Sequence, residues 1–357
     1  MSRKLITIST IMTLMSTSVI ADVPNVAADI APIHSLVSRV MDGVGAPKLI
    51  VQSGASPHGY RLRPSEAKAL QDADHVFWMG EELTPWLDSA IGTLASKASV
   101  TTLLDQQGVI LHDFREGALF EAHDHSAHGD DDHDDHDDHD DHKDHDDHDD
   151  HDDHDDHKDH DDHDDHDDHD DHKDHDDHDD HDDHDDHGSH DPHAWLSPEN
   201  AKLWLNIIAS KLSVSDPENA ATYFMNAAAG QAEIEAMIAE VKATLKPVQG
   251  GKFVVFHDAY QYFENDFDFY ASGAISLGDS SDPSPARIEK VQKRIRDEGI
   301  QCVLAEPQFK KGLVATVMEG SDATASVIDP LGAELETGPK LYTRLIKNMA
   351  KTLRNCL

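Results

Sequence analysis

The residues best suited to chemistry in this sequence form a histidine tract with a fixed spacing. From His133 to His187 a histidine occupies every third position, nineteen in all, and aspartate pairs fill nearly every gap. Imidazole and carboxylate groups are ligands for divalent transition metals. The tract therefore predicts loose, low-affinity binding of several metal ions, either to collect the metal or to sense its abundance, and an inert, solvated insert is the alternative. The candidate ligands include His123, His125, His128, His133, His136, His187 and His190.

The charge of the chain is concentrated in this tract. The chain carries a formal net charge of −43, and residues 121–191 contain 39 acidic residues and three lysines, which leaves only −7 for the remainder. A segment this polar cannot bury enough apolar surface to fold, so we expect residues 123–190 to be a disordered loop. Its charge would repel nucleic acid and anionic lipid and attract cations, so no nucleic-acid partner is expected.

A second candidate site comes from histidines outside the tract. His58 follows the predicted strand 48–52 by a short loop, His257 directly follows strand 252–256, and Asp329 directly follows strand 325–328. His193 lies between the tract and a predicted helix. Because ligands in open α/β sheets bind beyond the carboxyl ends of strands, these four residues could gather in one cleft. His34, His75 and His112 lack this context and are not expected to be ligands.

Three imidazoles and one oxygen form a donor set typical of zinc, because manganese and magnesium prefer more oxygen. Each residue also has a structural alternative: a histidine at a strand end can be a hydrogen-bonded structural residue, and Asp329 before Pro330 can form an Asx turn. A catalytic zinc with an open fourth position is another alternative. However, the sequence has no HExxH motif and no obvious general base.

The elements that must position these residues alternate between strand and helix. In the first half, predicted strands 48–52, 75–79 and 100–104 alternate with helices 64–72 and 85–96; in the second, strands 252–256, 302–305 and 325–328 alternate with helices 285–298, 313–320 and 339–355. This alternation predicts an α/β fold with parallel sheets. Between the halves, a predicted helix from 218 to 246 is long enough to join two lobes as a stiff strut.

The N-terminal stretch indicates export, and the two cysteines suggest one cross-link. Arg3 and Lys4 precede an apolar stretch that ends at Ala21, which is typical of a cleaved signal peptide over residues 1–21. A membrane anchor is the alternative, although the stretch is short and rich in Ser and Thr for a span. The two cysteines, Cys302 and Cys356, suggest one disulfide in an oxidising compartment, with two free thiols as the alternative.

Five stretches together resemble a known family. They are PHGYRLRPSEAKALQDAD (57–74), DPHAWLSPENA (191–201), FVVFHDAYQYFE (253–264), CVLAEPQF (302–309) and IDPLG (328–332). They look like the zinc-specific solute-binding proteins of ABC importers, the ZnuA-like, metal-specific cluster A-I family. The histidine- and aspartate-rich insertion before the DPH motif also resembles that family, and the match covers essentially the whole mature chain.

The resemblance implies two Rossmann-like α/β lobes joined by one long rigid helix, with Zn²⁺ in the cleft between them. The family's histidine ligands fall on His58, His193 and His257, its acidic position on Asp329, and its cysteine pair on Cys302 and Cys356. Some zinc-binding members carry Glu just before the first histidine, where this chain has Pro57, so Asp329 or water is left as the fourth ligand.

We therefore expect a non-enzymatic, monomeric protein of the periplasm that captures zinc and delivers it to a membrane permease; a periplasmic zinc buffer or chaperone is the alternative, and a zinc hydrolase is a weaker one. The expected organisation is an N-terminal lobe over 22–213, a linking helix over 214–248 and a C-terminal lobe over 249–357.

Overall fold

A computed structural model describes residues 23–115, 120, 190–276, 278, 283–308 and 311–357. The expected signal peptide and the tract histidines other than His190 lie outside these residues. In the described part of the chain, no helix combines the length and apolar character needed to cross a membrane.

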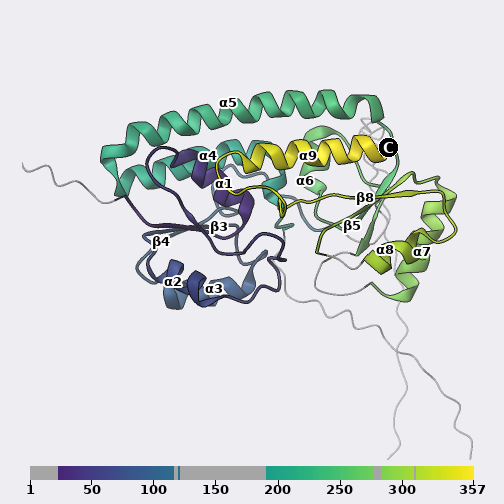
Figure 1. Ribbon diagram of the computed structural model, residues 1–357, viewed down its shortest axis with the longest axis horizontal. Helices are drawn as coiled ribbons and strands as arrows, with labels where there is room; N and C mark the ends of the chain where they lie inside the picture. Colours follow the sequence, from purple (N-terminus) through teal and green to yellow (C-terminus); the bar gives the residue numbers. More distant parts are fainter. Residues whose placement is uncertain (1–22, 116–119, 121–189, 277, 279–282, 309–310) are drawn as a thin grey trace, which may run out of the picture. The chain divides into compact units, whose positions relative to one another are not determined.

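The fold contains two four-stranded sheets, and every strand pair in them is parallel (Figure 1). The first has the order β2-β1-β3-β4 and is built from β1 (Val26–Ala28), β2 (Lys48–Leu49), β3 (His75–Trp78) and β4 (Ser99–Thr102). The second has the order β6-β5-β7-β8 and is built from β5 (Phe253–His257), β6 (Ala274–Ser276), β7 (Cys302–Ala305) and β8 (Thr324–Val327). The predicted pair of parallel α/β lobes is confirmed.

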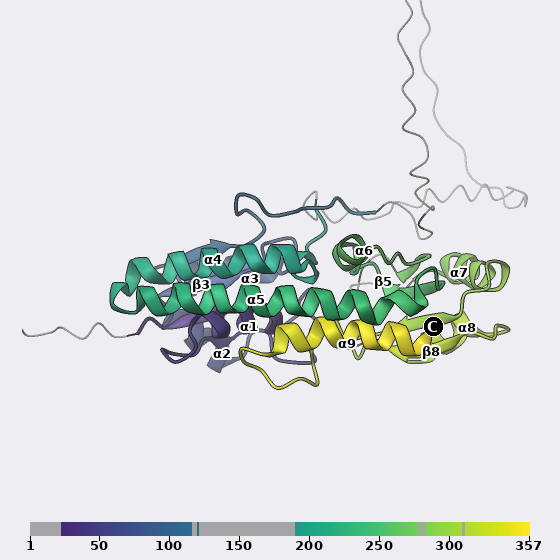
Figure 2. The same cartoon turned by 90° about the horizontal axis from the view of Figure 1, so that it is seen from above.

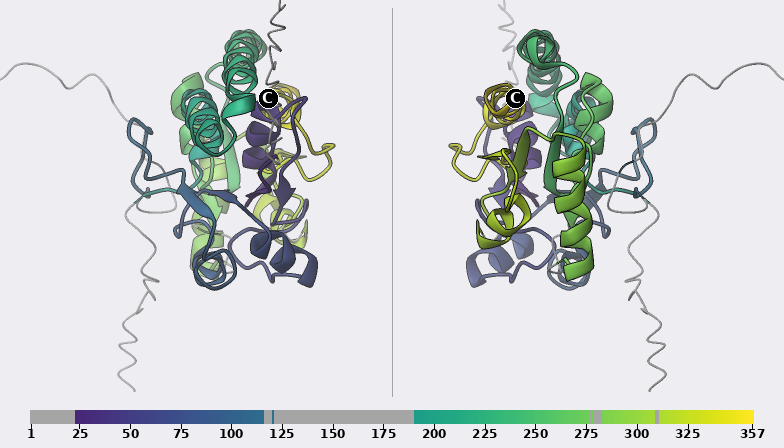
Figure 3. Two further views of the ribbon diagram at one scale, coloured as in Figure 1. Left: turned by 90° about the vertical axis from the view of Figure 1, so that its left-hand side faces the viewer. Right: turned by 90° about the vertical axis from the view of Figure 1, so that its right-hand side faces the viewer.

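Helices cover both faces of each sheet. The α-helices are α1 (Ala31–Val40), α2 (Pro64–Gln71), α3 (Pro85–Leu94), α4 (Pro198–Ser215), α5 (Ala220–Leu245), α6 (Gln261–Phe267), α7 (Pro285–Asp297), α8 (Lys311–Met318) and α9 (Leu341–Cys356). In the first lobe α2 and α3 lie on one side of the sheet, with α1 and α4 on the other (Figures 1 and 3). In the second lobe α7 and α8 lie on the side of the sheet away from α9.

This layering explains why the inner strand β5 is apolar from Phe253 to Phe256. Val254 and Phe256 of β5 pack in the cluster under α7 and α8, whereas Phe253 and Val255 belong to the cluster on the opposite face. Successive side chains of a strand point to opposite faces, and both faces are buried in a parallel sheet covered by helices. The larger cluster contains residues of both lobes and of α5 and α9, so one hydrophobic core runs through the join.

Helix α5 joins the lobes and is slightly shorter than the predicted helix over 218–246. It contains 26 residues, or about 39 Å at 1.5 Å per residue, and single 3-10 turns precede it (η2, Pro217–Asn219) and follow it (η3, Lys246–Val248). Its interior Gly230 is a packing requirement, because a Cβ there would lie 2.9 Å from Leu205 Cδ1 and 3.1 Å from Arg39 Cγ.

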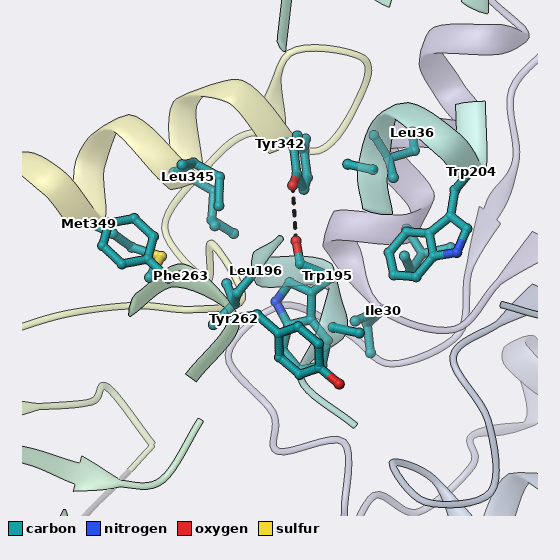
Figure 4. Close-up of a cluster of buried hydrophobic side chains, with 14 of the residues drawn as sticks. Ile30, Leu36, Trp195, Leu196, Trp204, Tyr262, Phe263, Tyr342, Leu345 and Met349 are labelled. Carbon is teal, nitrogen blue, oxygen red and sulfur yellow. Dashed lines mark hydrogen bonds between the residues drawn. The ribbon is translucent and has the colours of Figure 1, made fainter. Parts of the chain in front are cut away.

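The C-terminal helix was expected to belong to the second lobe alone, but it also packs on the first. Helix α9 runs beside α5 and reaches α1 (Figure 2). Tyr342 donates its hydroxyl to the Trp195 carbonyl at 3.0 Å (Figure 4), and its backbone N–H donates to Ser35 Oγ at 3.0 Å. The lobes are therefore fastened to each other by this helix as well as by α5.

Candidate metal centre

The predicted histidines lie at the carboxyl ends of the two sheets, as parallel topology requires. His257 is the last residue of β5, not the residue after it, and is 3% exposed. His193 precedes the 3-10 turn η1 (Ala194–Leu196) and is 5% exposed. His58 lies on the loop between β2 and α2 and is half-buried.

Hydrogen bonds fix the loop that carries His58 on both sides of it. The indole Nε1 of Trp86 donates to the Pro57 carbonyl at 2.7 Å. The hydroxyl of Tyr60 donates to Glu66 Oε1 at 2.7 Å, and the rings of Tyr60 and Trp86 lie 5.7 Å apart. The backbone next to His58 is therefore held, although the ring itself is half-buried.

His193 and His257 come from different halves of the chain and meet directly. Their Nε2 atoms lie 3.4 Å apart and their ring centroids 5.2 Å apart. Two imidazole nitrogens that bind one tetrahedral Zn²⁺ at the usual bond length lie about 3.3–3.4 Å apart. The observed separation therefore matches one edge of a zinc tetrahedron.

A buried carboxylate holds the other ring nitrogen of each histidine. His193 Nδ1 lies 2.6 Å from Asp191 Oδ1, which also accepts the His193 backbone N–H at 3.0 Å. His257 Nδ1 lies 2.5 Å from Glu306 Oε1, and Gln308 Nε2 donates to Glu306 Oε2 at 2.7 Å. Carboxylates in this position orient imidazole ligands and raise their basicity.

These contacts set the tautomer of both rings. If each Nδ1–H donates to its carboxylate, both Nε2 atoms present lone pairs to each other and neither can donate. Two lone pairs at 3.4 Å repel unless a proton or a cation lies between them. A cation between the two Nε2 atoms would remove this repulsion.

The site opens into a small cavity of about 10 Å³, which is room for one atom-sized guest. The residues that line it are Pro57, His58, His193, Trp195, His257, Gln308, Pro330 and Leu331. The structure thus brings all three predicted histidines to one cavity. The ring centroids of His58 and His193 lie 5.7 Å apart.

The three histidines are not yet spaced as a finished site. Across the described residues, no three His, Cys, Asp or Glu side chains stand where they could hold one ion without adjustment. His58 is half-buried and lies on a loop, whereas His193 and His257 are buried and held by carboxylates. A modest movement of the His58 side chain is therefore the adjustment that a three-histidine site needs.

Asp329 follows β8, but its carboxylate is engaged in a turn. Oδ1 accepts the N–H groups of Leu331 at 3.0 Å and Gly332 at 2.9 Å, and Oδ2 accepts that of Ala333 at 2.6 Å. Its neighbours Pro330 and Leu331 line the cavity, but Asp329 itself does not. The Asx-turn alternative describes what Asp329 does in this arrangement, and its role as fourth ligand stays a prediction.

The histidines that were not expected to be ligands lie elsewhere. His34 Nε2 bonds the Pro47 carbonyl at 3.2 Å, and His75 Nε2 bonds Ser215 Oγ at 2.7 Å. The His112 ring packs on Tyr262 at 4.7 Å. His190, by contrast, was a candidate low-affinity ligand of the tract, and its Nδ1 lies 2.8 Å from Asp113 Oδ1 in an antiparallel bridge.

Sequence reasoning missed the two carboxylates. Glu306 directly follows β7, which lies beside β5 in the sheet, so the strand-end argument that selected His257 also applied to it. Asp191 lies two residues before His193, and its backbone is fixed by its own N–H to the His112 carbonyl and by Tyr262 Oη to its carbonyl. Only the spatial pairing reveals their role.

Comparison with known proteins gives a consistent result. Residues 26–356 match the family model described as ZnuA, zinc-uptake complex component A, periplasmic. The chain is 47% identical over 332 residues to the high-affinity zinc uptake system protein ZnuA of Brucella abortus, covering 93% of this chain and 91% of the relative. The protein of the same name from Paracoccus denitrificans is 43% identical over 338 residues, covering 94% and 93%.

Solved structures show the same fold at low sequence identity. A crystal structure of ZnuA has a TM-score of 0.64 at 19% identity, covering 94% of this chain and 99% of the other. A ZnuA variant lacking residues 138–173 in its own numbering, with zinc bound, has a TM-score of 0.65 at 19% identity, covering 94% and 98%.

Proposed function

The chain belongs to the ZnuA family of periplasmic zinc-uptake components, and we propose that it captures one Zn²⁺ between its lobes and delivers it to the permease of an ABC importer. The ligands are His58, His193 and His257. The observation that carries this assignment is the 3.4 Å separation of the two Nε2 atoms, with a buried carboxylate behind each ring.

Zinc supplies a positive charge that satisfies both facing lone pairs, and the chain supplies the orientation. Asp191 and Glu306 accept the protons of the two Nδ1 atoms, and this orients both Nε2 atoms as metal ligands. His58 closes the set from its loop. Asp329 or a water molecule fills the fourth position; for Asp329 this requires exchange of at least one of its three turn hydrogen bonds.

Hydrolysis is not favoured by this arrangement. A zinc hydrolase needs a general base within reach of a metal-bound water. Among the residues that line the cavity, the polar side-chain groups besides the three histidines are the amide of Gln308 and the indole N–H of Trp195, and neither is a general base. The nearby carboxylate of Glu306 is already held by His257 and Gln308. A periplasmic buffer would need the same ligands, but the relatives are uptake components, which favours delivery to a permease.

The His/Asp tract is proposed as a separate, low-affinity collector of zinc that raises the local supply. An antiparallel bridge joins Asp113, which precedes the tract in the sequence, to His190, three residues before His193. Deleting residues 123–189 leaves that bridge in place. The full chain is expected to bind several zinc ions and the deletion variant one tight ion; a stoichiometry of one in both would remove the collector role.

The histidine site itself is tested by zinc titration against a competing chelator. The triple variant His58→Ala, His193→Ala, His257→Ala is made in the tract-deleted chain, so that tract binding does not mask the result. His112→Ala in the same background is the control, because His112 lies outside the cavity. Loss of tight zinc in the triple variant alone is expected, and tight binding that survives would refute the assignment.

A further inference from the structure

A short segment of the first lobe crosses to the second beside the metal site. This crossing segment (residues 110–115) starts on α4, where Asn200 Oδ1 accepts the Ile110 N–H at 2.8 Å and Asn200 Nδ2 donates to the Ile110 carbonyl at 2.9 Å. It then reaches α6, where Tyr262 Oη accepts the His112 N–H at 3.1 Å. Its last residue, Arg115, enters the second lobe.

The guanidinium of Arg115 binds two carboxylates of the second lobe. Nε lies 3.0 Å from each oxygen of Asp258, and Nη2 makes a further, short contact with Asp258 Oδ1. Nη1 lies 2.6 Å from Glu264 Oε2, and Nη2 lies 3.3 Å from Glu264 Oε1. One face of the guanidinium lies on the Phe120 ring, with Arg115 Cζ 3.6 Å from the ring centroid.

This cluster is almost fully removed from water. The side chains of Arg115, Asp258 and Glu264 are 14%, 7% and 1% exposed. Burial alone would lower the pKa of Arg115, but the two carboxylates raise it above its usual value, so the cation persists. Removing one member of a buried ion cluster leaves the others without compensation, and the chain must rearrange or take up protons.

The position of Asp258 connects this cluster to the metal site, because Asp258 directly follows His257. A shift of Asp258 toward water would move the backbone of His257. The 3.4 Å separation from His193 depends on that backbone, because the backbone carries the His257 ring. Arg115 itself does not line the zinc cavity.

We propose that Arg115 is a positioning residue for zinc capture: by holding Asp258 across the lobes it fixes the chain after His257 and so the spacing of the His193–His257 pair. The proposal rests on the proposed function of that pair. A purely electrostatic role has the opposite sign, because a positive charge near the site repels Zn²⁺ and its removal would tighten binding. The direction of the change therefore separates positioning from charge.

The test compares Arg115→Met with Arg39→Met in the tract-deleted chain. Arg39 is a matched control, because its side chain is also 14% exposed and binds Glu233 through Nε at 3.2 Å and Nη2 at 3.1 Å. It joins α1 to α5 and does not line the zinc cavity. Arg115→Lys is the third variant, which keeps the charge but loses the planar fork that grips two carboxylates.

Two readouts are measured: zinc affinity by chelator competition, and the d–d absorption spectrum of the Co²⁺-loaded protein, which reports ligand geometry. Arg115→Met is expected to weaken zinc binding by about tenfold or more and to alter the Co²⁺ spectrum. Arg39→Met should match the natural chain in both, and Arg115→Lys should lie between. If Arg115→Met does not fold, the test uses Arg115→Lys in its place. The positioning role then requires that Arg115→Lys alter the Co²⁺ spectrum.

Unchanged or tighter zinc binding in Arg115→Met, with the natural Co²⁺ spectrum, would overturn the positioning role. An equal loss of affinity in Arg39→Met would also overturn it, since the effect would then be one of general stability. Failure of the natural chain to bind zinc tightly would instead refute the proposed function. Failure of the positioning role can therefore be distinguished from failure of the proposed function.

Discussion

His193 and His257 are 64 residues apart in the sequence, and their Nε2 atoms face each other at 3.4 Å. His193 directly precedes the 3-10 turn η1, and His257 is the last residue of strand β5 in the second sheet. A carboxylate contacts Nδ1 of each ring, and the Nε2 atoms point toward each other. The pair is an interlobe feature that neither half of the chain could make alone.

The carboxylate behind His257 gives the first prediction. Glu306→Gln keeps the shape of the side chain but removes the charge that stabilises the imidazole as a metal ligand. Zinc affinity should fall by about 10- to 100-fold, measured by chelator competition. The control is Glu240→Gln, which removes an exposed carboxylate bonded to Lys347 at 2.8 Å on the outside of the molecule. Equal affinities in the two variants would show that Glu306 does not support the site.

The disulfide gives the second prediction. Cys302 and Cys356 form the predicted cross-link, which ties the start of β7 to the end of α9 over a separation of 54 residues. Replacing both cysteines by serine should lower the free energy of unfolding by roughly 4 kcal/mol through the lost chain constraint. Chemical denaturation of the zinc-free protein measures this. Zinc affinity should not change, because Glu306 lies at the opposite end of β7; a large loss of affinity would contradict this separation of roles.

Gly230 in the middle of α5 gives the third prediction. Alanine is favoured over glycine by about 1 kcal/mol in a helix interior, but the new Cβ would meet Leu205 Cδ1 at 2.9 Å. Leu205 is fully buried and cannot move aside freely. Overpacking of this kind costs about 1–3 kcal/mol, so Gly230→Ala should be destabilising in urea denaturation. A stabilised variant would show that the contact between α4 and α5 adapts.

A buried carboxylate in the first lobe gives the fourth prediction. Burial raises the pKa of Asp29 from 3.8 to about 7, although the N–H groups of Ile30 and Met79, each at 2.7 Å, lower it. The folded state therefore binds a proton that the unfolded state has lost between about pH 4 and 7. This contribution to stability is fully present below pH 4 and is lost as the pH rises through 7.

Asp29→Asn removes this titration. The unfolding free energy of the natural chain should thus fall relative to that of the variant as the pH rises from 4 to 8. The change should not exceed about 1.4 kcal/mol per pH unit, the limit for one proton. Urea denaturation of both proteins, zinc-free, at several pH values gives the comparison. Parallel pH profiles would mean that Asp29 titrates alike in the folded and unfolded chain.

Much of this molecule could be predicted from strand–helix alternation. Strand β7 has the predicted bounds, Cys302–Ala305. Each end of α5 lies within two residues of the predicted helix bounds, 218 and 246. Strand β1 and helix α6 were missed: β1 is three residues long, and α6, at seven residues, is too short to show a helical period. The boundary between α4 and the linking helix also moved, because α4 continues to Ser215.

The candidate site was predicted by residue type and strand position, but its supports were not. His58, His193 and His257 were selected because they lie near strand ends or a motif, which parallel topology brings together. Asp191 and Glu306 were not selected: the strand-end argument also applied to Glu306, and the pairing of each carboxylate with its histidine depends on side-chain directions that the sequence does not give. The place of α9 against α1 was missed for the same reason: its amphipathic pattern shows that one face is buried but not which partner covers it.

The most direct test of the central claim is a crystal structure of the zinc-loaded chain with diffraction data collected on both sides of the zinc absorption edge. One anomalous peak is expected in the cavity, about 2.0–2.1 Å from Nε2 of His58, His193 and His257. A peak bound by fewer than three of these histidines, or no peak in that cavity while zinc sits elsewhere on the lobes, would contradict the account.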